Sequence, residues 1–165
     1  NLHDLGYSGS RFDDIYATNA TIQTSDRNEK QDIEELSDAE QRVAVACKGL
    51  LRKFRWKDSV AEKGDAARIH FGIIAQDLQV AFAAQGLDAG DYAMFISSTW
   101  WETQTEVDAV EAVEATEDTE AVEAADAYTR TDMFYTLAEA PTGATERTRL
   151  GVRYPELLAF IISAI

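Results

Sequence analysis

Apolar residues recur near helical spacing between residues 26 and 52. The apolar positions of this segment are Ile33, Leu36, Val43, Leu50 and Leu51. Such spacing places apolar side chains on one face of a helix and therefore predicts helical structure over 26–52. Ser37 followed by Glu40 is a capping-box pattern, which predicts a break or a new helix start at Ser37.

Two further helices are predicted later in the chain. Residues 77–85 place Leu78 and Phe82 on one face, and Gly86 is a typical helix stop. Residues 154–165 carry a proline in the expected first turn, and their apolar residues cover most of the helical circumference. A helix this apolar must be buried, either against symmetry-related copies in a central bundle or in the core of its own chain.

Short β-prone runs stand at 54–57, 68–74, 94–101 and 130–153. The first two runs, with a turn at Lys63-Gly64-Asp65, predict a hairpin over 53–75. The run at 94–101 predicts a single strand, and the last run is predicted to turn at Pro141-Thr142-Gly143. Helices and antiparallel strands in these proportions indicate an α+β fold.

Two segments differ from the rest in composition. Residues 1–24 are turn-rich and β-prone with sparse apolar positions, so we expect them to pack on upstream residues of a longer protein or on other copies of themselves. Residues 102–127 hold ten acidic residues and no basic residue, in a repeat rich in Val, Glu and Ala. We interpret 102–127 as an expanded insertion, a solvated loop or a hairpin arm, because adjacent acidic residues disfavour a helix.

The charge balance excludes several classes of function. Thirty acidic residues face fifteen basic ones, for a net charge of −15. Binding to a phosphate backbone or to an anionic membrane surface needs a basic face, so we expect no nucleic-acid partner and no membrane partner. Cys47 is the only cysteine and lies in an apolar stretch, which predicts a buried, inert thiol. The sequence contains no metal-ligand cluster and no phosphate loop, and we expect no cofactor and no metal.

One segment carries residues suited to nucleophilic chemistry, Thr24-Ser25-Asp26-Arg27-Asn28-Glu29-Lys30. On a helix, Ser25 and Lys30 would lie about 140° apart, so they can meet only if Ser25 precedes the helix in the turn that enters it. The residues alone also fit a helix cap at Ser25 or Asp26 and an ordinary surface lysine at position 30.

The wider sequence resembles the intramolecular chaperone domains that end phage endosialidases, neck appendages and L-shaped tail fibres. The quoted segment, with Ile33, resembles the cleavage motif of that family. The central block at 54–77, Gly86-Leu87-Asp88 and the closing Gly151–Leu158 are also similar, in the same order. Residues 5–16 resemble the segment that ends the upstream fibre, whereas 102–127 departs from the pattern.

This resemblance implies an intertwined homotrimer with helices packed around the threefold axis and with β-hairpin arms. It implies that residues 1–24 end the stalk of the fibre and that residues 25–165 form the chaperone domain. Such a domain would hold three fibre strands of the same polypeptide in register while they fold in the host cytoplasm during virion assembly. The chaperone domain would then be released, and the fibre would become part of the virion tail.

The resemblance also implies an autoproteolytic serine endopeptidase that acts once on itself. Ser25 would be the nucleophile, Lys30 the general base and Ser25-Asp26 the scissile bond. His70 matches a histidine that the family needs for release, although a plain strand residue in the core or interface fits equally well. An ordinary lysine is almost wholly protonated at neutral pH, so we expect Lys30 to become competent only when assembly removes it from water.

Two other interpretations compete with self-cleavage. The first is a permanent trimerisation or receptor-binding tip that never cuts, against which the intact motif at Ser25 and Lys30 argues. The second is an enzyme that acts on outside substrates, which has little support because the chain shows no second catalytic motif.

Overall fold

The computed structural model describes residues 25–112 and 123–165. The predictions for residues 1–24, and for the centre of the acidic insertion at 113–122, lie outside the described residues. The described residues divide into two compact units, one of 25–97 with 150–165 and one of 98–112 with 123–149. The elements are helices and small antiparallel sheets, which confirms the α+β class.

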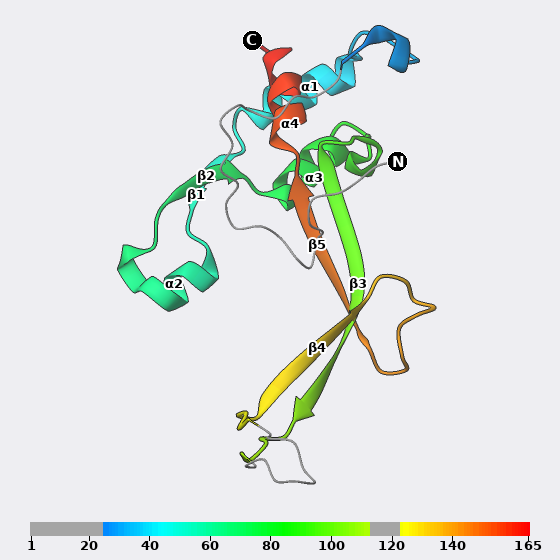
Figure 1. Cartoon of the computed structure of the whole chain (residues 1–165). Helices are drawn as coiled ribbons and strands as arrows, with labels where there is room; N and C mark the ends of the chain where they lie inside the picture. Colours follow the sequence, from blue (N-terminus) through cyan, green and yellow to red (C-terminus); the bar gives the residue numbers. More distant parts are fainter. Residues whose placement is uncertain (1–24, 113–122) are drawn as a thin grey trace. The chain divides into compact units, whose positions relative to one another are not determined.

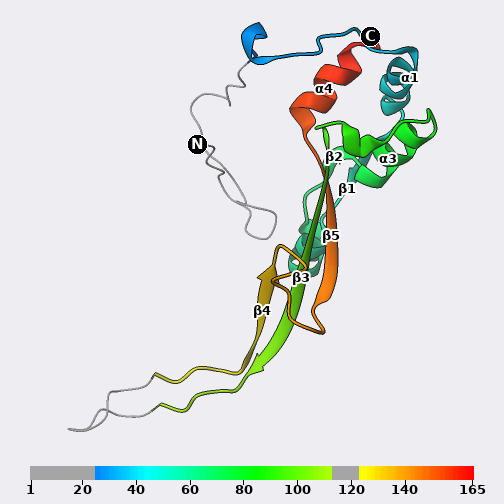
Figure 2. The same cartoon turned by 90° about the vertical axis from the view of Figure 1, so that its right-hand side faces the viewer.

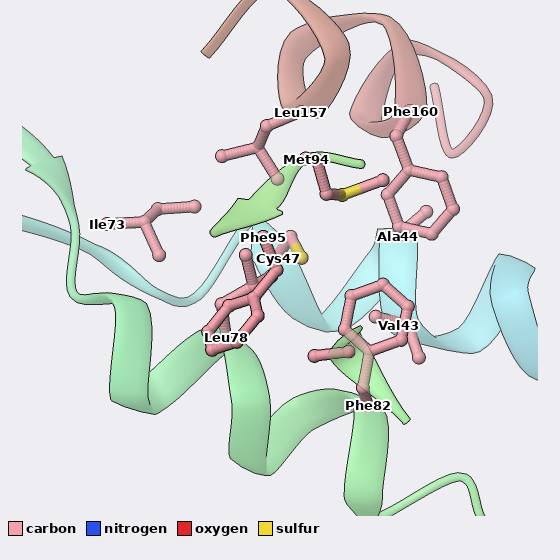
Figure 3. Packing of buried hydrophobic residues seen from close by; sticks show 11 residues of the cluster. Val43, Ala44, Cys47, Ile73, Leu78, Phe82, Met94, Phe95, Leu157 and Phe160 are labelled. Carbon is pink, nitrogen blue, oxygen red and sulfur yellow. The ribbon is translucent and has the colours of Figure 1, made fainter. Parts of the chain in front are cut away.

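Three helices build the core of the first unit: α1 (Asp38–Cys47), α3 (Ala75–Ala83) and α4 (Tyr154–Ile162). Helix α1 packs against both α3 and α4 (Figures 1 and 2). Their facing side chains form one apolar cluster, shown in Figure 3, whose largest fully buried members are Phe82, Leu78, Leu157, Val43 and Cys47. The predicted buried thiol at Cys47 is confirmed, and burial in this apolar cluster raises its pKa.

The start of α1 is held by the predicted capping box. The Ser37 hydroxyl accepts from the backbone N–H of Glu40 at 3.3 Å, and the Glu40 carboxylate accepts from the backbone N–H of Ser37 at 2.6 Å. The other carboxylate oxygen of Glu40 accepts a hydrogen bond from the Tyr92 hydroxyl at 2.9 Å. One carboxylate therefore fastens the first turn of α1 to the loop that follows η3 (Ala89–Asp91).

The hairpin predicted over 53–75 exists in a shorter form. Strands β1 (Leu51–Phe54) and β2 (His70–Ile73) pair antiparallel, with Leu51 opposite Ile73 and Phe54 opposite His70. Residues after Phe54 do not continue the strand as predicted, because helix α2 (Lys57–Lys63) and the 3-10 turn η2 (Gly64–Ala66) connect the two strands. Alternation over four residues was too short a pattern to separate a strand from a helix start.

Helix α4 confirms the predicted C-terminal helix, with its proline in the first turn. Its Tyr154 hydroxyl accepts from the backbone N–H of Ile73 at 3.0 Å, and the same hydroxyl lies where a Cβ on Gly72 would be. Only glycine at position 72 therefore lets α4 contact β2 in this way. One face of α4 is buried in the core, while Leu158 and Ile162, one turn apart, are 56% and 66% exposed.

The second unit is built on long strands. Its strands are β3 (Phe95–Val107), β4 (Tyr128–Phe134) and β5 (Thr145–Val152), and they form a three-stranded sheet in the order β4-β3-β5. Strands β3 and β5 each contribute residues to both units. Strands β3 and β4 pair antiparallel from Trp101 opposite Phe134 to Val107 opposite Tyr128. The predicted turn at Gly143 lies between β4 and β5, with φ of 91° that favours glycine.

The strand predicted over 94–101 is longer than expected and runs to Val107. Residues 102–107 belong to β3, and the pairing is resumed by a bridge between Val110 and Ala125 (Figure 2). Their acidic side chains have partners that composition did not reveal. Glu102 accepts from the Arg147 guanidinium at 2.7 Å, which lowers its pKa, and Glu106 accepts from the Thr129 hydroxyl at 2.9 Å.

Removal of a core side chain from α3 tests the packing of the helices. Leu78→Ala should lower the free energy of unfolding by about 2–5 kcal/mol, because a fully buried leucine leaves a cavity when it is truncated. Gln79→Ala is the matched control, since Gln79 is the exposed neighbour on the same helix, and it should change stability by no more than about 0.5 kcal/mol. Urea unfolding at a fixed protein concentration measures both; equal losses would contradict the assigned core.

Acid should loosen the capped start of α1. The hydroxyl and backbone N–H of Ser37 hold the pKa of Glu40 below its usual value, so this carboxylate stabilises the fold above its unfolded-state pKa. That contribution is lost as the pH falls through the lowered pKa of the folded state. Glu40→Gln should therefore be less stable than the wild type at neutral pH, and the difference should shrink as the pH falls from about 5 toward 3. Denaturant unfolding along this pH series would contradict the assignment if the difference stayed constant.

Candidate active site

The segment around Ser25 folds as a short capped turn instead of the predicted helix. The 3-10 turn η1 spans only Arg27–Glu29, and no regular structure separates it from the cap of α1 at Ser37. Asp26 caps this turn: its side chain accepts from the backbone N–H of Asn28 at 2.9 Å and from the Asn28 side chain at 3.0 Å. The prediction of a helix over 26–36 is wrong because this polar segment has few apolar side chains to bury.

The capped turn brings Lys30 back to Ser25. The backbone N–H of Lys30 donates to the Arg27 carbonyl at 3.2 Å, and the chain leaves the turn in an extended conformation at Lys30. In that position Lys30 Nζ donates to Ser25 Oγ at 2.6 Å. Ser25 thus lies ahead of the turn, which is the arrangement that the sequence required for the two side chains to meet.

The surroundings of this pair are polar and exposed in the single chain. Ser25 and Lys30 are both exposed. Among the described residues no ion pair involves Lys30, and its side chain bonds only to Ser25. The chain thus aligns the hydroxyl with the amine but does not remove either group from water.

His70 lies in a separate aromatic group. It is the first residue of β2, it is exposed, and its ring stacks on Phe54 at 6.0 Å and meets the edge of Trp56 at 6.2 Å. It forms no hydrogen bond with Ser25 or Lys30 in the described part of the chain. These three rings were not grouped from the sequence, although the alternation of Phe54 and Trp56 was the available signal.

Other kinds of site receive little support from the described residues. Within these ranges, no three His, Cys, Asp or Glu side chains gather as metal ligands. The second unit has an open cavity of about 270 Å³ beside the Glu102–Arg147 ion pair, between β3 and the start of β5. Over the described residues, no helix has the length and apolar character needed to cross a membrane.

A family model and two phage tail proteins match this chain, and all three indicate the same kind of protein. Residues 25–87 match the model of the peptidase S74 family, described as chaperone of endosialidase. The chain is 42% identical over 109 residues to a probable tail spike protein of Klebsiella phage 0507-KN2-1, which covers 66% of this chain and 9% of that protein. It is 34% identical over 107 residues to the side tail fiber protein pb1 of Escherichia phage T5, covering 65% of this chain and 7% of that protein.

A solved structure shares the fold. The carboxy-terminal domain of the bacteriophage T5 L-shaped tail fibre, with its intra-molecular chaperone domain, superposes with a TM-score of 0.70 and 24% identity. That match covers 99% of this chain and 34% of the solved one. The chain spans less than a tenth of the two phage proteins compared above. The resemblance predicted from the sequence is confirmed: residues 25–87 match the chaperone-of-endosialidase family, within a chain similar to phage tail spikes and tail fibres.

Proposed function

We propose that this chain is the intramolecular chaperone of a phage tail fibre or tailspike, which trimerises, registers the upstream fibre and then releases itself. Residues 1–24 would end the fibre stalk and residues 25–165 would form the chaperone, acting in the host cytoplasm during virion assembly. The family match at 25–87 and the tail proteins among its relatives support the chaperone role. The observation that carries self-release is the 2.6 Å contact between Lys30 Nζ and Ser25 Oγ.

Trimerisation gives a physical purpose to the exposed apolar surface of α4. Leu158 and Ile162 form a stripe on the face opposite the buried Leu157 and Phe160, and their exposure is costly in water. Three copies of α4 packed around an axis would bury this stripe. Holding three chains together also raises the effective concentration of the fibre strands, which must otherwise pair between separate chains.

Cleavage at Ser25-Asp26 would use the pair as nucleophile and base. As observed, the lysine donates to the hydroxyl; once the ammonium loses its proton, the same contact runs from the hydroxyl to the amine. Oγ then attacks the carbonyl carbon of a Ser25-Asp26 bond within the trimer, the C–N bond to Asp26 breaks, and Lys30 passes the proton to the departing Asp26 nitrogen. Water hydrolyses the resulting ester and restores the hydroxyl. Because burial favours the neutral amine, assembly around Lys30 would switch the reaction on.

His70 would act in release through its place beside Phe54 and Trp56 rather than at the hydroxyl. Its ring contacts are those two aromatic side chains, and the family resemblance is what links it to release. In the single chain His70 is exposed and Trp56 is 55% exposed, so assembly could cover these two rings.

Substitution of the dyad tests self-release. Ser25→Ala removes the nucleophile and Lys30→Ala the base, so each should slow cleavage by at least about 10²-fold. Lys30→Arg should fail as well, because a guanidinium keeps its proton at any relevant pH. Intact mass of the chain with its upstream fibre measures cleavage, and light scattering should show a trimer for all three variants. Normal cleavage by Lys30→Arg would exclude Lys30 as the base, and a wild-type trimer that stays intact would favour a permanent clamp.

Substitution of the cap tests whether the turn positions the pair. Asp26→Ala removes the acceptor for the Asn28 N–H and should destabilise the turn by about 1 kcal/mol, which lowers the cleavage rate about fivefold. Asp26→Asn is the matched variant, since asparagine also caps well, and it should restore most of the rate. The first-order cleavage rate, read by mass, decides between them. If both variants cut as fast as the wild type, the cap has no positioning role.

A further inference from the structure

The hydroxyl and the bond to be cut belong to the same residue, which limits the chemistry. The scissile carbonyl of the Ser25-Asp26 bond is bonded to the Cα of Ser25, and Oγ reaches that Cα through Cβ. Attack by Oγ on its own carbonyl would close a four-membered ring. Productive attack needs reacting atoms about 3–3.5 Å apart with aligned orbitals, and the short covalent path within one serine does not allow this alignment.

One chain brings the nucleophile and the base together, but it places no Ser25-Asp26 carbonyl where the nucleophile can attack it. Ser25 Oγ and Lys30 Nζ come from the same copy and are already 2.6 Å apart. Asp26 cannot replace the serine, because its carboxylate caps η1 through the two hydrogen bonds with Asn28. Ser25 is exposed, so the backbone of a second chain can approach its hydroxyl. The catalytic pair is therefore complete in one copy, and a carbonyl in attacking position must come from elsewhere.

We propose that the Ser25 hydroxyl of one copy cuts the Ser25-Asp26 bond of a neighbouring copy in the same trimer. This inference rests on the proposed self-cleaving function. Oγ of the first copy forms an ester with the Ser25 carbonyl carbon of the second, the C–N bond to Asp26 breaks, and the hydroxyl proton reaches the new Asp26 amine through Lys30 of the first copy. Water then hydrolyses the ester between the chains, so the net reaction is hydrolysis of one peptide bond.

Cutting between copies explains how an exposed pair can remain inactive before assembly. A lone chain has the base and the nucleophile but no carbonyl in position, so it stays intact even while the 2.6 Å contact is made. Around a threefold axis each copy would cut one neighbour and be cut by the other. The requirement for a second copy would couple release to trimer formation independently of any burial of Lys30.

Mixed trimers of the full chain with its upstream fibre test this inference. Wild-type chains and Lys30→Ala chains with different tags are co-expressed, with the wild type in excess, and intact mass reports which chains are cut. The Lys30→Ala chain has no base of its own but keeps the residues of the scissile bond. It should stay whole in its own homotrimer and be cut in most mixed trimers. Ser25→Ala chains mixed with the wild type should behave in the same way.

Two controls separate this inference from the proposed function. A mixture of Ser25→Ala and Lys30→Ala chains contains no copy with both groups and should stay intact, since the contact forms within one chain. Cleavage of wild-type homotrimers establishes self-release itself, whatever the mixed trimers show. If only wild-type chains are cut in mixed trimers, cleavage occurs within each copy and this inference is overturned. A released fragment that begins at Ser25 also overturns it, because attack on the preceding carbonyl closes a five-membered ring within one copy.

Discussion

The hydrogen bond between Lys30 and Ser25 is the interaction on which the proposed function depends, and a turn of three residues creates it. Without the cap at Asp26, five intervening peptide bonds would let the two side chains separate freely. Few specific residues are needed to form the turn, because its cap consists of one carboxylate and the backbone N–H of Asn28. It orients the amine on the hydroxyl while both remain in water, so orientation is complete in one chain and activation is left to assembly.

The helical core and the exposed stripe of α4 serve two levels of structure. Phe82, Leu78 and Leu157 give one chain a fold of its own, whereas Leu158 and Ile162 remain on the surface. This division fits a chaperone that must fold before the fibre that it assembles. The Tyr154 contact with Gly72 and Ile73 fastens α4 to β2, so the stripe is presented by a fixed element rather than by a loose terminus.

Local patterns predicted the elements that local forces determine. The capping box at Ser37, the buried face of α3 with Leu78 and Phe82, and the proline start of α4 were all legible because each depends on residues within one turn. Helix α2 was missed because alternation over four residues did not separate a strand from a helix start. Strand β3 was ended too early, since its acidic residues bond to Arg147 and Thr129, which are distant in sequence. The sequence predicted that Ser25 and Lys30 can meet only if Ser25 precedes the helix, but it did not predict the 3-10 turn that brings them together.

Separation of the full chain by oligomeric state, with its upstream fibre attached, tests most directly whether assembly switches on the Ser25–Lys30 pair. Monomer and trimer fractions would be isolated at low temperature, warmed, and followed by intact mass over time. The account predicts that only the trimer releases a fragment beginning at Asp26, at a first-order rate that does not change on dilution. Release of the same fragment at the same rate from a stable monomer would contradict it, because the exposed pair of one chain would then suffice.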